Sequence, residues 1–177
     1  MLSTLIPALL FWFVLPIHTL TVTDLSTGDV IIRCPIAPGD TFKSVYIHSL
    51  ELTPVWEYFQ IDARYDIILT DTLYESTGAG LPIPIDGQDT FRKEGRQFHI
   101  FNIQRRLPAI VLRVNSAYDN CIMLNDTLSF NLSDTLGNAV VRIETNAEPL
   151  GVFTFRTLYR DLVHHFGDHR LKRWLPG

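Results

Sequence analysis

The fold is decided by two neighbouring stretches of the chain, FKSVYIHS at residues 42–49 and PVWEYFQID at residues 54–62. Both are rich in aromatic and β-branched residues, which is the usual composition of β-strands. Residues 50–53 form a four-residue connection between them. The sequence therefore predicts an antiparallel hairpin, and the rest of the fold is expected to build outward from it.

Similar short runs recur on both sides of this hairpin, separated by turn signals such as STGD at 26–29 and APGD at 37–40. The further strands are expected at residues 19–22, 30–34, 67–70, 98–101, 110–114, 121–124 and 140–143. Many short strands with turns between them are typical of all-β domains. We therefore expect an all-β fold, a sandwich or barrel-like arrangement of antiparallel sheets, in one domain over residues 19–177.

One helix is expected near the C-terminus of this domain. Apolar residues recur there at helical spacing: Phe155, Leu158, Tyr159, Leu162 and Phe166. Thr154 or Thr157 could cap the helix and Gly167 would end it. We expect the helix to pack on a sheet and to lead into a basic tail, since residues 156–177 carry five Lys and Arg against two Asp and Glu.

Residues 1–18 differ from the body of the chain. Residues 2–17 are apolar except for Ser3 and Thr4, and the segment is shorter than the roughly 20 residues of a membrane-spanning helix. We expect a signal or membrane-anchor segment, and cleavage and retention both stay open. The protein is then extracytoplasmic, periplasmic or on the outer face of the cell membrane; a buried N-terminal element of a cytosolic fold is the alternative.

Charge and cysteine content bound the function. The net charge is −4 and no aromatic-interleaved basic patch is present, so no nucleic-acid partner is expected. Cys34 and Cys121 lack the spacing of zinc or thioredoxin-like motifs. Outside the cytoplasm they could form a disulfide, and two isolated core thiols are the equal alternative.

Polar residues inside the strands of the hairpin mark the candidate site. With a four-residue connection, Tyr46 lies opposite Glu57 and His48 opposite Val55, so Tyr46, His48 and Glu57 share one face. Such a cluster could recognise a ligand, bind a metal, act as a catalytic base, or fix the register as a buried polar network. The pattern lacks a metal-ligand set and a nucleophile, so no catalytic residue, metal or cofactor is expected.

A long loop, Ser76 to Gly95, follows this hairpin in sequence and contains glycines that allow close approach of the backbone to a ligand. The candidate ligand-binding residues are therefore Tyr46, His48, Ser49, Glu51, Glu57, Gly78, Gly80 and Pro82.

YIHS at 46–49, Glu51, TPV at 53–55, Glu57 and GAGLP at 78–82 also resemble the recurring pattern of a bacterial and archaeal family, domain of unknown function 1850. The resemblance covers about residues 20–115. It implies a small exported or membrane-anchored protein whose gene often adjoins those of tripartite ATP-independent periplasmic transporters. The partners it implies are the transporter membrane subunit or the substrate-binding protein, with the membrane contacted through residues 2–17.

From the resemblance we expect an extracytoplasmic accessory or binding protein of a tripartite solute transporter, and not an enzyme. The alternatives are a hydrolase that depends on His48 and Glu57, and an envelope structural protein without a ligand.

Overall fold

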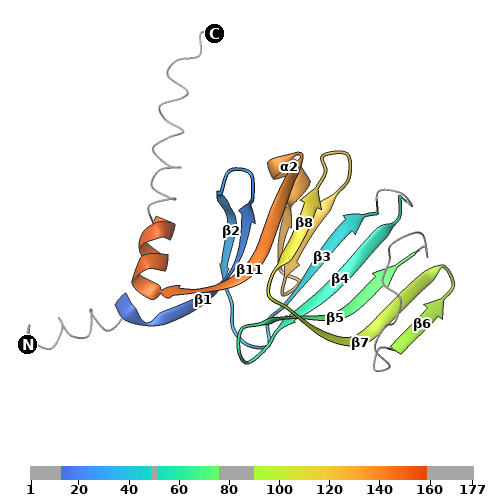
Figure 1. Ribbon diagram of the computed structural model, residues 1–177, viewed down its shortest axis with the longest axis horizontal. Helices are drawn as coiled ribbons and strands as arrows, with labels where there is room; N and C mark the ends of the chain where they lie inside the picture. The colour runs from blue at the N-terminus through green and yellow to red at the C-terminus, as the bar shows by residue number, and fades with distance from the viewer. Residues whose placement is uncertain (1–12, 49–51, 76–89, 159–177) are drawn as a thin grey trace, which may run out of the picture. The chain divides into compact units, whose positions relative to one another are not determined.

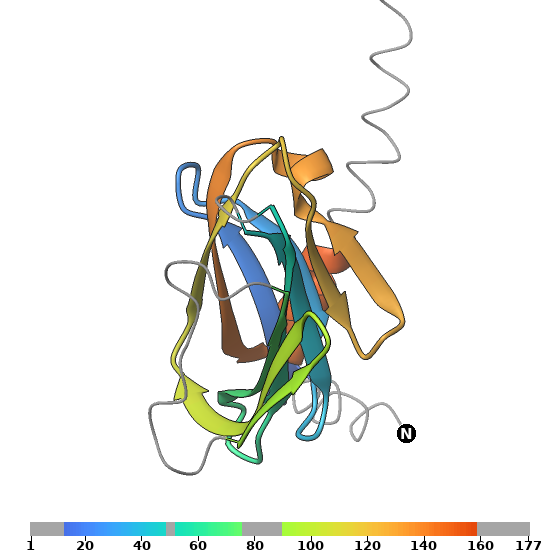
Figure 2. The same ribbon diagram turned by 90° about the vertical axis from the view of Figure 1, so that its right-hand side faces the viewer.

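The computed structural model describes residues 13–48, 52–75 and 90–158. Two compact units divide the chain, one of Met1–Thr19 with Ala147–Gly177 and the other of Leu20–Asn146. Two antiparallel sheets build the second unit, and Figures 1 and 2 show them as separate layers. The predicted all-β class is confirmed, and the presence of two distinct sheets makes the fold a sandwich rather than a barrel.

The small sheet has four strands in the order β2-β1-β11-β8. Their bounds are β1 Pro16–Asp24, β2 Val30–Pro35, β8 Ile110–Val114 and β11 Ala139–Pro149. β1 and β11 pass through both compact units, and β1 begins at Pro16, inside the apolar segment at the N-terminus. Gly28, in the predicted turn at residues 26–29, has a φ angle of 80°, and Gly137, two residues before β11, has a φ angle of 67°.

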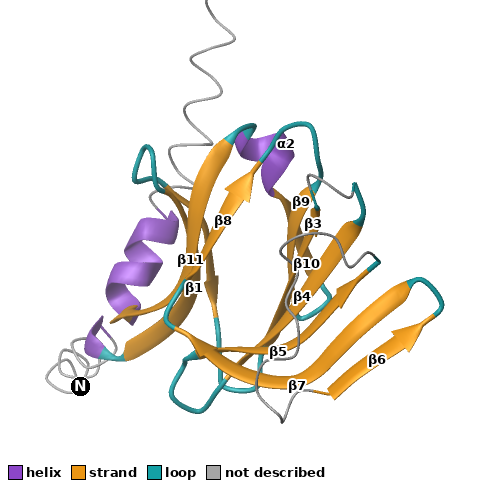
Figure 3. Ribbon diagram, turned by 45° about the vertical axis from the view of Figure 1, so that its right-hand side comes forward, coloured by secondary structure: helices purple, strands orange, loops and turns teal. Residues whose placement is uncertain are grey.

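The large sheet has seven strands in the order β10-β9-β3-β4-β5-β7-β6. Their bounds are β3 Thr41–Ile47, β4 Pro54–Ile61, β5 Ile67–Tyr74, β6 Thr90–Glu94, β7 Gln97–Leu107, β9 Asn120–Leu124 and β10 Leu128–Asn131. The predicted hairpin forms β3 and β4 near its centre (Figure 3). The nine strands expected from the sequence are all present; β6 and β10 are additional.

The main core fills the space between the two sheets of the second unit. Val22 and Val141 from the small sheet belong to the same buried cluster as Phe42, Phe59 and Ile122 from the large sheet. Phe42 and Phe59 stack with ring centroids 4.7 Å apart across β3 and β4. Burial of these apolar side chains is the main force that holds the sheets together.

Short irregular elements complete the sandwich. The helix α2 (Leu132–Leu136) follows β10 directly, and Asn131 caps it by accepting hydrogen bonds from the backbone N–H groups of Ser133 and Asp134. β7 bulges where it pairs with β5, and Asn102 and Gln104 in the bulge have φ angles of 60° and 50°.

In the other compact unit, a helix covers residues 150–158 in the described part of the chain. It begins before the predicted caps, so the capping prediction was wrong: the hydroxyls of Thr154 and Thr157 instead donate to carbonyl groups one turn earlier in the helix. Phe155 and Leu158 are 66% and 64% exposed, although their spacing predicted a buried face. Gly151 lies against the ring of Phe13, where a Cβ atom would clash.

The remaining predictions for this part of the chain concern Tyr159, Leu162, Phe166 and Gly167, which lie outside the described residues. Among the described residues, no helix has the length and apolar character needed to cross a membrane.

Candidate functional site

A row of three polar side chains crosses the inner face of the large sheet. Ser44 on β3 pairs with Glu57 on β4, and Glu57 pairs with Thr72 on β5. Strand side chains alternate between the two faces of a sheet, so these three lie on the same face as the buried Phe42 and Phe59. We call this set of Ser44, Glu57 and Thr72 the polar row.

Apolar and aromatic side chains surround the polar row. Ile122 on β9 pairs with Ser44, and Ile100 on β7 pairs with Thr72, so an isoleucine closes each end of the row. On the side away from the main core, Tyr46 and Tyr74 flank Val55, the residue two positions before Glu57 on β4. The row therefore lies between an apolar core and a pair of tyrosines.

The two hydroxyls of the polar row are buried without a partner. Ser44 and Thr72 are 1% and 0% exposed, and within the described part of the chain neither hydroxyl has a hydrogen-bond partner. The hydroxyl of Thr53, at the end of the hairpin, is in the same condition. A buried polar group without a partner costs about 1–3 kcal/mol, and such groups are rare in native proteins. Two such hydroxyls lie on the strands on either side of the one that carries the carboxyl group of Glu57.

Glu57 is the ionisable centre of this site. Burial raises the pKa of its carboxyl group. Burial also raises the pKa of Tyr46, and the negative charge of Glu57 raises it further. As a carboxylate, Glu57 accepts hydrogen bonds and donates none.

The register of the hairpin differs from the predicted one by two residues. Tyr46 pairs with Val55 rather than with Glu57, and the backbone N–H of His48 donates to the carbonyl of Thr53 at 2.9 Å. The N–H of Leu52 also donates to the carbonyl of His48 at 2.8 Å, so His48 lies opposite Thr53 rather than opposite Val55. A shift by two preserves the face of every side chain, so the prediction that Tyr46 and Glu57 share a face is confirmed.

The remaining predicted site residues have different outcomes. His48 lies directly after β3 and is half-buried. Its backbone hydrogen bond to Thr53 continues the pairing of β3 with β4 by one residue. Ser49, Glu51, Gly78, Gly80 and Pro82 lie outside the described residues. The prediction of a loop from Ser76 to Gly95 was wrong at its C-terminal end. Residues from Thr90 onward form β6, whose backbone pairs with β7.

Ser44 and Thr72 were missed as site residues, although the sequence carries a signal for both. Ser44 is in phase with the apolar Phe42 and with Tyr46, and Thr72 is in phase with Tyr74. With a period of two, each small polar residue must then occupy the face of a strand that its neighbours bury.

The cysteines do not contribute to a site. Neither Cys34 nor Cys121 forms a disulfide. Cys34 on β2 packs against the main core, whereas Cys121 lies on β9 of the other sheet, out of phase with the buried Ile122. The alternative of two separate thiols therefore holds. In the described part of the chain, His, Cys, Asp and Glu form no group of three that could hold a metal ion.

A groove of about 240 Å³ lies on the other face of the large sheet. Thr41, Phe42, Lys43, Tyr58, Phe59, Thr70, Asp71, Met123 and Asp126 line it. Lys43 contacts Asp126 at 2.8 Å and Asp71 contacts His99 at 3.1 Å. The charged side chains that line the groove are therefore paired.

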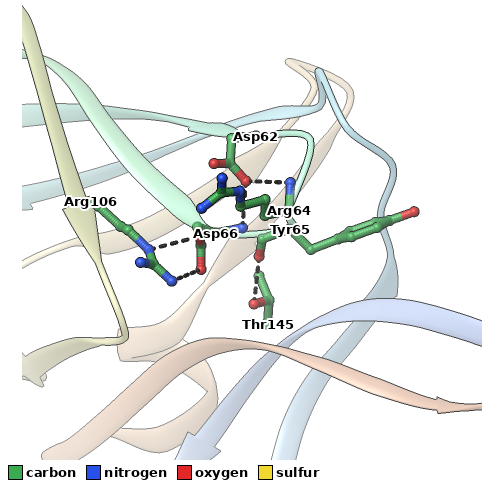
Figure 4. A network of polar contacts seen from close by, with 6 residues as sticks. All are labelled: Asp62, Arg64, Tyr65, Asp66, Arg106 and Thr145. Carbon is green, nitrogen blue, oxygen red and sulfur yellow. Dashed lines mark hydrogen bonds and ion pairs between the residues drawn. The ribbon is translucent and has the colours of Figure 1, made fainter.

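A second polar cluster surrounds the loop between β4 and β5 (Figure 4). The carboxylate of Asp62 accepts from the backbone N–H groups of Arg64 and Asp66, each at 2.8 Å. Arg106 on β7 holds Asp66 through two contacts of 2.7 and 2.9 Å. Thr145 on β11 donates to the carbonyl of Tyr65 at 2.7 Å, which ties this loop of the large sheet to the small sheet. We call this set the loop network.

Comparison with known proteins places the chain in a family. A family model described as Domain of unknown function (DUF1850) matches residues 42–130. The chain belongs to this family. The DUF1850 match runs from β3 to β10 and includes the whole polar row. No curated protein and no solved structure matches the chain significantly.

Proposed function

We propose that this protein is an extracytoplasmic accessory or binding protein of a tripartite solute transporter, and that it holds a small polar ligand at the polar row. One observation carries the binding role: Ser44 and Thr72 are buried without partners on either side of Glu57 among the described residues. The transporter role rests on what the resemblance to this family implies, a gene next to those of such a transporter. The location outside the cytoplasm rests on the apolar residues 2–17.

The alternative role of the cluster is a buried network that fixes the strand register. Such networks stabilise a unique fold when every polar group in them has a hydrogen-bond partner. A network that leaves some groups unpaired makes the fold less stable than an apolar core would. The unpaired hydroxyls of Ser44 and Thr72 therefore favour binding over a purely structural role.

The binding role can be tested with a pair of variants on one strand. Sugars, polyols, amino acids, carboxylates and amines are screened for solutes that raise the melting temperature of the wild-type protein. Thr72→Val removes an unpaired hydroxyl, whereas Thr70→Val removes one that donates to the carbonyl of Tyr58 at 3.1 Å. We expect a stabilising solute whose effect Thr72→Val abolishes and Thr70→Val preserves. If no solute stabilises the wild type, or both variants respond alike, the binding proposal fails.

The location is tested separately by a reporter fused after Gly177. We expect activity only outside the cytoplasm. Deletion of the gene should then reduce uptake of the identified solute by the adjoining transporter, and expression of wild-type protein should restore it. A fusion that is active in the cytoplasm contradicts the proposed location.

A further inference from the structure

The polar row supplies one negative charge and no positive charge. Ion pairs in the described part of the chain join Lys43 to Asp126, His99 to Asp71, Arg106 to Asp66, Arg142 to Glu144 and Arg156 to Glu148, and none of these involves Glu57. Glu57 thus has no cationic partner among them. A partly buried carboxylate without a counter-ion favours a ligand that brings a positive charge and disfavours an anion.

The hydrogen-bonding capacity of the polar row also favours a positively charged ligand. The carboxylate of Glu57 only accepts, and the hydroxyls of Ser44 and Thr72 can each accept as well. Neighbouring strands are about 4.8 Å apart, so these acceptors are spread across three strands rather than gathered at one point. A ligand with several N–H donors, such as an ammonium or a planar guanidinium group, is suited to Glu57 and to a flanking hydroxyl.

Aromatic side chains complete the surroundings of Glu57. Tyr46 and Tyr74 are both diagonal neighbours of Glu57, one on each adjacent strand, and diagonal neighbours lie about 7–8 Å apart. Tyr74 is 3% exposed and stacks on Phe98 at 5.5 Å, so its ring is held in place. Aromatic rings beside a carboxylate attract organic cations, because the face of each ring carries partial negative charge.

We infer that the polar row binds a small organic cation with N–H donors, an amine or a guanidine, and that Glu57 is its counter-ion. This inference rests on the proposed binding function and assigns the chemistry of the ligand. Ser44 and Thr72 accept hydrogen bonds from it, and Tyr46 and Tyr74 contact its apolar part or its charge.

The test uses the full-length protein and four probes that share a butyl chain: butylguanidinium, butylammonium, the neutral butylurea and the anionic butyrate. Isothermal titration calorimetry gives each affinity. We expect one or both of the two cations to bind at least about tenfold more tightly than butylurea, the effect of one charge-assisted hydrogen bond, and butyrate not to bind.

Variants then locate the effect. Glu57→Gln should weaken cation binding by at least about tenfold and leave butylurea nearly unchanged. Asp71→Asn is the matched control, because it removes a carboxylate from the neighbouring strand on the other face of the same sheet. Thr72→Val is a second variant that keeps the charge of Glu57 and should weaken both cations. Calorimetric melting of each variant confirms that it is folded.

Butylurea that binds as tightly as the cations, cation binding that survives Glu57→Gln, or no binding by either cation would each overturn the inference. These outcomes are distinguishable from failure of the proposed function. If the solute screen gives a neutral or anionic ligand that depends on Thr72, the binding function stands and only the cation assignment is wrong.

Discussion

The loop network and the polar row are built on the same pair of strands but differ in whether their polar groups have hydrogen-bond partners. The loop at Asp62–Asp66 joins β4 to β5, which carry Glu57 and Thr72 farther along. In the loop, both aspartates have partners at 2.7–2.9 Å. In the polar row, two hydroxyls are fully buried and have no partner among the described residues.

This difference is the one we expect between a structural network and the proposed binding site. The loop network connects the loop between β4 and β5 to β7 through Arg106 and to β11 through Thr145. The polar row retains hydrogen-bonding capacity at a cost to the folded protein, which selection for stability alone would remove. Three variants test this contrast, in order of decreasing effect on stability, and a fourth experiment tests the state of the cysteines.

The largest effect is expected at the loop network. Asp62→Ala removes the acceptor of two backbone N–H groups and should lower the stability by about 1–2 kcal/mol, the usual cost of losing a capping side chain. The melting temperature should then fall by about 2–8 °C, with binding at the polar row unchanged. Chemical denaturation measures the loss. Asp62→Asn keeps an acceptor and serves as the control; equal losses in both variants would show that the hydrogen bonds are not responsible.

The opposite sign is expected in the polar row. Thr72→Val replaces an unpaired buried hydroxyl by a methyl group and should stabilise the protein without ligand by about 1 kcal/mol. Thr70→Val, with the same change on the same strand, should destabilise it, because the hydroxyl of Thr70 donates to the carbonyl of Tyr58. Thermal melting of both variants provides the comparison. If Thr72→Val loses stability like Thr70→Val, the hydroxyl of Thr72 has a partner in the apo protein and the contrast fails.

A pH-dependent effect is expected at Glu57. Because burial raises its pKa, the folded protein holds the proton of Glu57 more tightly than the unfolded chain does, and stability falls as pH rises above the ordinary value of 4.5. Glu57→Gln should therefore raise the melting temperature relative to wild type at about pH 8, with the difference shrinking below about pH 4. The groups that face Glu57 from the neighbouring strands, Tyr46 and Tyr74, both have raised pKa values and stay neutral in this range. A difference that does not change with pH would contradict this account.

No effect is expected from reduction. Cys34 and Cys121 form no disulfide, so a reducing agent should leave the melting temperature unchanged, whereas a disulfide closing this loop would contribute roughly 4–5 kcal/mol. The intact mass of the alkylated protein, measured without reduction, should show both thiols modified. A fall in melting temperature on reduction would show that the two residues pair.

Much of the fold could be predicted because the local sequence of most strands has a recognisable composition. Aromatic and β-branched runs between glycine turns located nine of the strands, and the period of two assigned faces to Tyr46 and Glu57. β6 and β10 were missed because their sequences, TFRKE and LSFN, are short and largely polar. Both are edge strands, which neighbours cover on one side only, and such strands need less apolar sequence.

The site could be predicted only in part, for a reason of distance along the chain. Tyr46 and Glu57 are close in sequence and share one hairpin, whereas Thr72 reaches Glu57 through the pairing of β4 with β5. That pairing contains a bulge between Tyr58 and Phe59, which no local pattern marks. The burial of Phe155 and Leu158 was predicted wrongly for a related reason, since spacing defines a helix face but not what covers it.

The sequence by itself determined the β-class, the strands near the centre of the large sheet, the shared face of Tyr46 and Glu57, and the family. Those properties follow from local composition and from the alternation of side chains, which hold for any register shifted by an even number of residues. The tertiary structure alone decided the actual register, the separation of Cys34 from Cys121, and the position of Glu57 between Ser44 and Thr72. These depend on which strands lie side by side, and that is settled by packing the two sheets around one core rather than by any segment alone.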